Sequence, residues 1–109
     1  MEKVFVISGM TTTMYDDGTD FNVASVHTTE DGARKGLRAE IDNRCACIKD
    51  DYLEQFNDED YAEDFDGYDT FEEFWDDWVK EHTCTSDYWR YDTDELSIVV
   101  FVKAVEVCE

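Results

Sequence analysis

The stretch Asp50–Trp78 reads DDYLEQFNDEDYAEDFDGYDTFEEFWDDW, and its mixture of acidic and aromatic residues decides how this chain can fold. Of its 29 residues, 14 are acidic, nine are aromatic and none is basic. Acidic tails are usually poor in aromatic residues and stay disordered, because they cannot bury enough apolar surface. The aromatic residues here predict instead that the stretch is pinned to a hydrophobic core while it displays carboxylates.

The end of this stretch predicts a helix over residues 70–82. Thr70-Phe-Glu-Glu73 fits the capping box, in which the Thr and Glu side chains satisfy free backbone N–H groups at a helix start. Apolar side chains then recur at helical spacing on one face: Phe71, Phe74, Trp75, Trp78, Val79 and His82. The acidic residues lie elsewhere on the helix. Within each of the pairs Glu72–Asp76 and Glu73–Asp77, the two carboxylates repel each other by roughly a few tenths of a kcal/mol.

A second apolar stripe predicts an earlier helix that is capped by Thr28 and runs to Phe56. Its members are three or four residues apart: Ala33, Leu37, Ile41, Cys45, Ile48, Tyr52 and Phe56. Gly32 and Gly36 weaken its first turns by about 1 kcal/mol each relative to Ala. A loop over 57–69, in which Asp-Gly marks a turn, then leads to the helix over 70–82.

Four apolar segments predict β-strands. They are Lys3–Gly9, Phe21–Thr28, Asp87–Asp92 and Leu96–Val107. The first two form a hairpin with a turn at Asp17-Gly18. The first and last strands are the most apolar, so we expect them side by side in the middle of the sheet. The order ββααββ predicts an α+β fold: a four-stranded, mainly antiparallel sheet with two helices on one face.

The charge of the chain restricts its partners. Nine Lys and Arg residues face 29 Asp and Glu residues, which gives a net charge of −20 over one predicted domain, residues 1–109. Direct binding to nucleic acid is disfavoured, because phosphates are repelled. A compact domain of this length is roughly 34 Å across, and DNA carries about 20 phosphates over that length. We therefore expect cations or basic proteins as partners.

The sequence also predicts where the protein resides. The start of the chain, Met1–Ile7, has no long apolar region typical of a secretory signal. No stretch approaches the roughly 18 apolar residues of a membrane span. We expect a cytoplasmic protein without membrane contacts, whose cysteines are free thiols in a reducing compartment.

The loop over 62–73 resembles an EF-hand calcium loop in part. Positions 3, 5, 6 and 12 of that pattern are filled by Asp64, Asp66, Gly67 and Glu73. It departs from the pattern at position 1, which is Ala62, and at position 8, which is Asp69. A chain with 29 acidic residues meets part of this pattern by chance. A solvated acidic loop is therefore the favoured interpretation, with weak calcium binding as the alternative.

Cysteine and histidine residues do not form a recognisable metal or catalytic pattern. The spacing of the cysteines matches no common zinc site: Cys45, Cys47, Cys84 and Cys108. In a helix, Cys45 and Cys47 point to nearly opposite sides, and Cys45 lies on the apolar stripe. Neither His27 nor His82 stands in a recognisable nucleophile–base–acid arrangement. We predict a protein that is not an enzyme and has no cofactor.

The aromatic residues Tyr88, Trp89 and Tyr91 allow two interpretations. Tyr and Trp are common anchors of protein interfaces. Alternatively, they cover the sheet as part of the core. The sequence favours neither.

The acidic block itself is either a solvated face or a surface that copies the charge of nucleic acid. Helix carboxylates at i, i+3 and i+4 are about 5–6 Å apart, which is comparable to the spacing of backbone phosphates. In size, charge and aromatic-rich acidic helices over Asp50–Glu81, the chain resembles small DNA-mimic inhibitors of phages and mobile elements. These include anti-CRISPR proteins, anti-restriction proteins and inhibitors of uracil-DNA glycosylase. The resemblance is one of overall character, and it implies a nucleic-acid-binding enzyme, such as a CRISPR effector, as partner.

We therefore predict a non-catalytic inhibitor that binds a basic nucleic-acid-binding defence protein. Its partner-binding residues are the carboxylates of the loop and of the helix over 70–82: Asp58, Glu59, Asp60, Glu63, Asp64, Asp66, Asp69, Glu72, Glu73, Asp76 and Asp77. Such binding is steered by charge and weakens with salt. The alternatives are a small interaction module of a mobile element without mimicry, and the weak calcium-binding protein.

Overall fold

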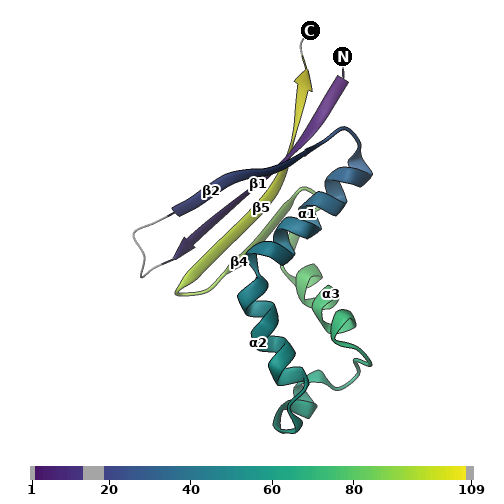
Figure 1. The fold of residues 1–109 in the computed structure, drawn as a ribbon, viewed down its shortest axis with the longest axis vertical. Helices are drawn as coiled ribbons and strands as arrows, with labels where there is room; N and C mark the ends of the chain where they lie inside the picture. Colours follow the sequence, from purple (N-terminus) through teal and green to yellow (C-terminus); the bar gives the residue numbers. More distant parts are fainter. Residues whose placement is uncertain (1, 14–18, 108–109) are drawn as a thin grey trace.

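The first and last strands lie side by side at the centre of the sheet, as the sequence predicts. β1 (Glu2–Thr13) and β5 (Leu96–Val107) pair antiparallel along their whole length. The computed structural model describes residues 2–13 and 19–107, and in it the remaining strands are added on both sides of this pair (Figure 1).

Over residues 2–13 and 19–107, the sheet has five antiparallel strands in the order β2-β1-β5-β4-β3. β2 (Thr19–His27) and β4 (Tyr88–Asp92) correspond to predicted strands. β3 (Thr83–Thr85) was missed, so the prediction of four strands is wrong by one. Three polar residues carry no strand signal, and pairing with β4 across a tight turn makes them a strand. The predicted turn at Asp17-Gly18 lies outside the described residues.

The long helix predicted to end at Phe56 is two helices that meet at Cys45. α1 (Glu30–Arg44) and α2 (Ala46–Phe56) stay joined by hydrogen bonds, from the Cys45 N–H to the Ile41 carbonyl (2.9 Å) and from the Lys49 N–H to the Cys45 carbonyl (2.8 Å). Cys45 itself leaves helical geometry, with φ −97° and ψ 15°. The prediction of one helix is wrong here because the apolar stripe runs unbroken through the bend.

Two glycines near the start of α1 make room for a strand. The cap of α1 is Thr29 and not Thr28, because the Thr29 Oγ1 accepts the Gly32 N–H at 3.0 Å. A Cβ atom at Gly36 would lie 2.3 Å from Nε2 of His27 at the end of β2. The glycines that weaken the helix therefore allow α1 to lie close against β2.

The loop predicted over 57–69 contains a 3₁₀ helix, η1 (Glu59–Phe65). Asp58 starts it, since its side chain accepts the Asp60 N–H at 3.0 Å. Phe65 is buried and holds the segment down, with its ring 5.4 Å from that of Phe56 and 4.8 Å from that of Phe74. The segment is thus anchored by its aromatic residue.

The capping box at the start of α3 (Phe71–Glu81) is confirmed in its first half. The Thr70 Oγ1 accepts the Glu73 N–H at 3.3 Å. The Glu73 carboxylate reaches back to the N–H of Asp69 at 3.2 Å, one residue before the cap. Gly67, with a φ of 96°, supplies the turn that leads into this helix, and a residue with a Cβ would be strained there.

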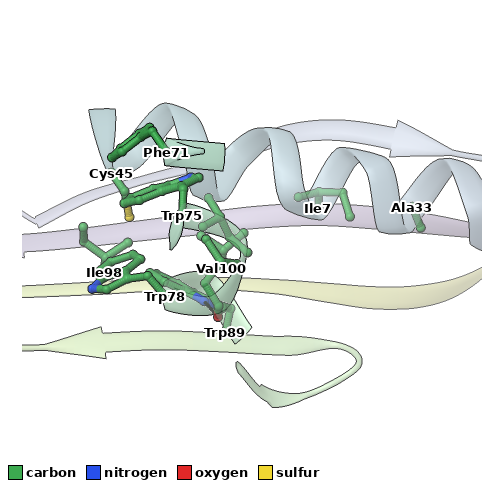
Figure 2. Packing of buried hydrophobic residues seen from close by; sticks show 11 residues of the cluster. Ile7, Ala33, Cys45, Phe71, Trp75, Trp78, Trp89, Ile98 and Val100 are labelled. Carbon is green, nitrogen blue, oxygen red and sulfur yellow. Dashed lines mark hydrogen bonds between the residues drawn. The ribbon is translucent and has the colours of Figure 1, made fainter. Parts of the chain in front are cut away.

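The core lies between one face of the sheet and the helices α1 and α3 (Figure 2). Trp78 is at its centre, with its ring 4.6 Å from that of Trp75 and 5.9 Å from that of Trp89. The Trp89 Nε1 donates to the Val79 carbonyl at 2.9 Å, which ties α3 to β4. Both predicted apolar stripes face this core. Its buried residues are Ile7, Ala33, Ile41, Cys45, Phe71, Trp75, Trp78, Val79, Trp89, Ile98 and Val100.

The aromatic residues of β4 are divided between the two faces of the sheet. Trp89 is buried, and Tyr91 packs against the core beside Trp78. Tyr88 pairs with Phe101 on the other face. Trp89 and Tyr91 therefore cover the sheet.

The molecule is elongated, with extents of 59 × 35 × 18 Å and a radius of gyration of 16.1 Å. In Figure 1, α2 leads away from the sheet, η1 lies at the far tip and α3 returns toward the sheet. We call residues 46–81 the helical arm. The prediction that two helices pack on one face holds for α1 and α3, whereas α2 has no buried residue. Glu2 and Val107 are paired at the opposite end of the molecule.

Candidate functional site

All of the predicted partner-binding carboxylates lie on the helical arm, and all are exposed. Those of Asp58 to Asp64 are on η1 or at its start, at the tip of the arm. Asp66 and Asp69 are in the turn that follows, and the remainder are on α3: Glu72, Glu73, Asp76 and Asp77. The structure thus gathers them on one continuous segment of the chain.

Aromatic rings form the inside of the arm and keep these carboxylates outside. Tyr52 of α2 lies 5.3 Å from Phe74 of α3, and Phe56 lies 5.9 Å from Phe71, measured between ring centroids. Phe65 joins the two helices from η1. Aromatic pairs of this kind stabilise by about 0.5–1.5 kcal/mol each beyond the area that they bury. The carboxylates are therefore displayed on a packed scaffold.

Three carboxylates of α3 have partners within the protein. Asp76 accepts from the Arg38 guanidinium of α1 at 2.6 Å, and Asp77 accepts from the Tyr68 hydroxyl at 3.0 Å. This bond to Asp77 raises the pKa of Tyr68. Partial burial works against the charge of Arg38, but its hydrogen bonds to Asp76 and Asp42 raise its pKa. The Glu73 carboxylate accepts the Asp69 N–H. Hydrogen bonds within the protein therefore offset much of the predicted repulsion between the carboxylates of this helix.

The remaining carboxylates of the set face solvent without a counter-ion. Within residues 2–13 and 19–107, no basic nitrogen lies within 4.0 Å of their oxygens. Asp58 is set apart because its carboxylate accepts the Asp60 N–H. We call the others the free carboxylates: Glu59, Asp60, Glu63, Asp64, Asp66, Asp69 and Glu72. They extend from the tip of the arm to the first turn of α3, and sequence reasoning could not separate them from the paired ones.

The comparison with DNA changes once the shape is known. A net charge of −20 over a length of 59 Å is one charge per about 3 Å, whereas B-DNA has one per roughly 1.7 Å. The predicted match to one DNA turn assumed a compact molecule about 34 Å across, so it is wrong for the molecule as a whole. The acidic residues are instead concentrated on the arm, because 14 of the 29 lie between Asp50 and Trp78.

The EF-hand-like residues are not gathered into a metal site. In the part of the chain that the structure describes, no group of three or more His, Cys, Asp or Glu side chains is placed to hold a metal ion. Glu73, which would be the bidentate ligand of the pattern, is turned to the Asp69 N–H. The turn at Asp66-Gly67 serves the start of α3 instead.

The cysteines and histidines have structural surroundings. Burial, with a smaller contribution from Asp42, raises the pKa of the Cys45 thiol to about 12, so this thiol is inert at neutral pH. Cys47 and Cys84 are exposed free thiols, and Cys108 lies outside the described residues. His82 packs between aromatic rings, 4.7 Å from Trp78.

A basic–acidic cluster that the sequence did not reveal lies between α1 and the sheet. The Arg44 side chain is 5% exposed, and its guanidinium pairs with Glu40 at 2.9 Å. It also donates to Thr11 at 2.6 Å and to Asn22. Gly9 of β1 leaves space for it, since a Cβ there would lie 2.2 Å from its Nε. This cluster joins α1, β1 and β2, so its role is structural.

No protein-family model, curated protein or solved structure matches the chain. Across residues 2–13 and 19–107, the helices are too short or too polar to cross a membrane. The geometry of the helical arm is therefore the basis for assigning a function.

Proposed function

We propose that the protein is a non-catalytic inhibitor that binds a basic nucleic-acid-binding defence protein, such as a CRISPR effector, through the free carboxylates of its helical arm. By occupying the site of guide, target or duplex DNA, the arm excludes the nucleic acid. The observation that supports this most is the separation of roles on the arm, where aromatic rings are inside and unpaired carboxylates are outside.

The packing of the arm favours binding to a rigid, basic channel. η1 and α3 are held by Phe65 and by the capping bonds of Thr70, so few backbone groups need to be ordered on binding. Preorganised surfaces lose less entropy on association. An unpaired carboxylate also has no internal salt bridge to break before it meets a Lys or Arg of the partner.

Two apolar side chains of the arm are exposed. Leu53 of α2 is 39% exposed and Tyr61 of η1 is 41% exposed. Aromatic residues inside a polar rim are frequent anchors of interfaces. We expect Tyr61 to contribute contact area at the tip of the arm, while the carboxylates set orientation and the rate of encounter.

The test neutralises four free carboxylates that have no structural bond: Glu59→Gln, Asp60→Asn, Glu63→Gln and Glu72→Gln. We call the described residues outside the arm the sheet end, which comprises 2–13, 19–45 and 82–107. A matched control removes the same charge from the sheet end: Asp87→Asn, Asp94→Asn, Glu95→Gln and Glu106→Gln. The readout is DNA binding by purified CRISPR effectors and restriction enzymes in the presence of each protein. Glu73, Asp76 and Asp77 are left unchanged, because their substitution would also break internal hydrogen bonds.

We expect the arm variant to lose inhibition by about 30-fold or more, since four exposed ion pairs at about 0.5 kcal/mol each amount to that factor. The sheet-end control should stay within about threefold of wild type. Inhibition by the wild type should also weaken as salt rises. Equal losses in both variants, or inhibition that is insensitive to salt, would contradict mimicry and would favour an interaction module without it.

A further inference from the structure

In the described part of the chain, no helix packs on the face of the sheet opposite α1 and α3. This face is largely apolar, and it is exposed along its edge although Ser8 and Val99 at its centre are buried. Side chains alternate between the two faces along a strand. Ile7 and Ile98 point into the core, so the residues next to them in β1 and β5 point to the opposite face. On the edge strand β2, Phe21, Val23 and Val26 are 57%, 55% and 56% exposed. They lie opposite Met10, Ser8 and Val6 of β1 in the register of the sheet. We call this surface the open sheet face.

The open sheet face is nearly neutral on a molecule of net charge −20. By register, Lys103 lies opposite Val6, and Arg90 lies opposite Val99. Arg90 is paired with Asp92 at 2.5 Å on the same face. The acidic groups that repel other copies of the chain are concentrated on the arm instead. This face is therefore where a second copy meets the least repulsion.

Two copies joined through this face keep their acidic arms apart. Packed sheets are about 10 Å apart, and in each copy the helices lie on the far side of its sheet. The helix layers of the two copies are then separated by both sheets, which exceeds the Debye length of about 8 Å at physiological ionic strength. Charge does not prevent such a dimer.

The area of the face is close to that of a standard interface. β1 and β5 have 12 residues each, β2 has nine and β4 has five. At about 3.4 Å per residue and about 4.8 Å between strands, their shared face covers about 600 Å² in projection. A standard interface removes about 800 Å² of accessible surface from each partner, and accessible area exceeds projected area. The face thus approaches the size that a stable dimer requires.

We propose that two copies of this chain associate through the open sheet face as a homodimer, in which the two sheets stack face to face with the arms outside. In a two-fold dimer each copy contributes the same surface, so the open sheet face would meet its own copy. Stacked sheets pack in this way with their strands crossing at about 30°. The dimer presents two arms, and its formation does not depend on the proposed function.

The first test measures the mass of the full-length protein by sedimentation and light scattering, with a reductant present because Cys47 and Cys84 are exposed thiols. We expect a dimer of a 12.8 kDa chain at roughly 100 μM. Its dissociation constant should fall as salt rises, because salt screens the repulsion between two acidic copies. Binding of a basic partner by the arm should weaken as salt rises, so the salt dependence distinguishes dimer formation from partner binding. A monomer at both low and high salt would overturn the proposal.

The second test places a charge on the face at two separated strands. Phe21→Lys with Val26→Lys changes β2, and Val105→Lys changes β5, while Leu53→Lys on α2 is the matched exposed control. All four residues are at least 38% exposed, so far-UV circular dichroism should show an intact fold. We expect each face variant to raise the dissociation constant of the dimer about 100-fold and the control to leave it unchanged.

The pattern of losses separates a face dimer from a dimer formed by strand edges. Because β1 lies between β2 and β5, pairing through the β2 edge would be lost only in the β2 variant. Pairing through the end of β5 would be lost only in Val105→Lys. Either result overturns the proposal, as does a dimer that persists in both face variants or is lost in Leu53→Lys. A Val26→Thr variant, which keeps the side-chain shape, should weaken the dimer less than the Lys pair.

Discussion

The sheet end and the helical arm use charge in opposite ways. At the sheet end, arginines are bound to carboxylates: Arg44 to Glu40 beneath α1, and Arg90 to Asp92 on β4. On the arm, most carboxylates have no counter-ion, and aromatic rings hold the helices together. The arginines of the sheet end therefore contribute to folding, whereas most carboxylates of the arm have no basic partner.

This difference means that folding and charge display depend on different residues of the arm. Removing a free carboxylate takes away no internal bond, so the fold should tolerate it. Removing a ring such as Phe65 would loosen the scaffold that positions the carboxylates. A surface built in this way can change its charge pattern without a loss of stability, and three predictions test that difference.

The largest effect is expected from Arg44→Ala at the sheet end. It leaves Glu40 buried without its partner and opens space above Gly9. Breaking a buried pair by removing one partner costs about 3–5 kcal/mol. Urea unfolding should show this loss in the free energy of unfolding.

The matched substitution on the arm is Glu72→Ala, which should change stability by less than about 0.5 kcal/mol. Adding Glu40→Gln to Arg44→Ala should recover part of the loss, because the buried charge is then removed. If Arg44→Ala and Glu72→Ala cost the same, the contrast between the two ends is wrong.

An intermediate effect is expected at Cys45, where the two regions meet. Its folded pKa of about 12 lies above the unfolded value of 9.0. The stabilisation by the neutral thiol is therefore full below pH 9 and is lost as the pH rises toward 12, by about 1.4 kcal/mol per pH unit. Unfolding of wild type and Cys45→Ala in reductant between pH 8 and 10.5 should show this as a steeper fall of stability with pH in wild type, because the raised pKa values of Tyr68 and Tyr91 act on both proteins.

The exposed Cys47 provides the control for that experiment. Cys47→Ala should keep the slope of the wild type, since its thiol is exposed in the folded protein. Parallel pH profiles for wild type and Cys45→Ala would mean that the thiol at the bend is not shielded from water.

The smallest effect is expected from the arm itself. Neutralising the four free carboxylates Glu59, Asp60, Glu63 and Glu72 should raise stability by about 0.5–1 kcal/mol at low salt, because like charges repel by a few tenths each. At high salt the gain should disappear. A loss of stability on neutralisation would show that these carboxylates contribute to folding after all.

Much of the fold followed from the sequence because its signals are local and periodic. The stripes that contain Cys45 and Trp78, the Thr70 cap and the central pairing of the first and last strands are all confirmed. Each depends on spacing or on apolar content, which sequence reasoning reads directly. The exposure of the predicted carboxylates followed in the same way, since acidic residues lay off the apolar stripe.

What the sequence did not reveal depends on contacts between distant segments. The bend at Cys45 arises because α2 leaves the sheet to pack on η1 and α3, and the apolar stripe gives no sign of it. The burial of Arg44 depends on Gly9, which is far away in the sequence. Which carboxylates are free also depends on tertiary contacts, since only the fold places Arg38 beside Asp76.

The pairing of Glu2 with Val107 has a practical consequence. Both lie at the pole opposite η1, on a molecule 59 Å long. A tether attached beyond either residue would hold the protein by one pole and direct the arm into solution. A label attached beyond Glu2 or Val107 can therefore serve surface-capture and fluorescence measurements while the free carboxylates stay accessible.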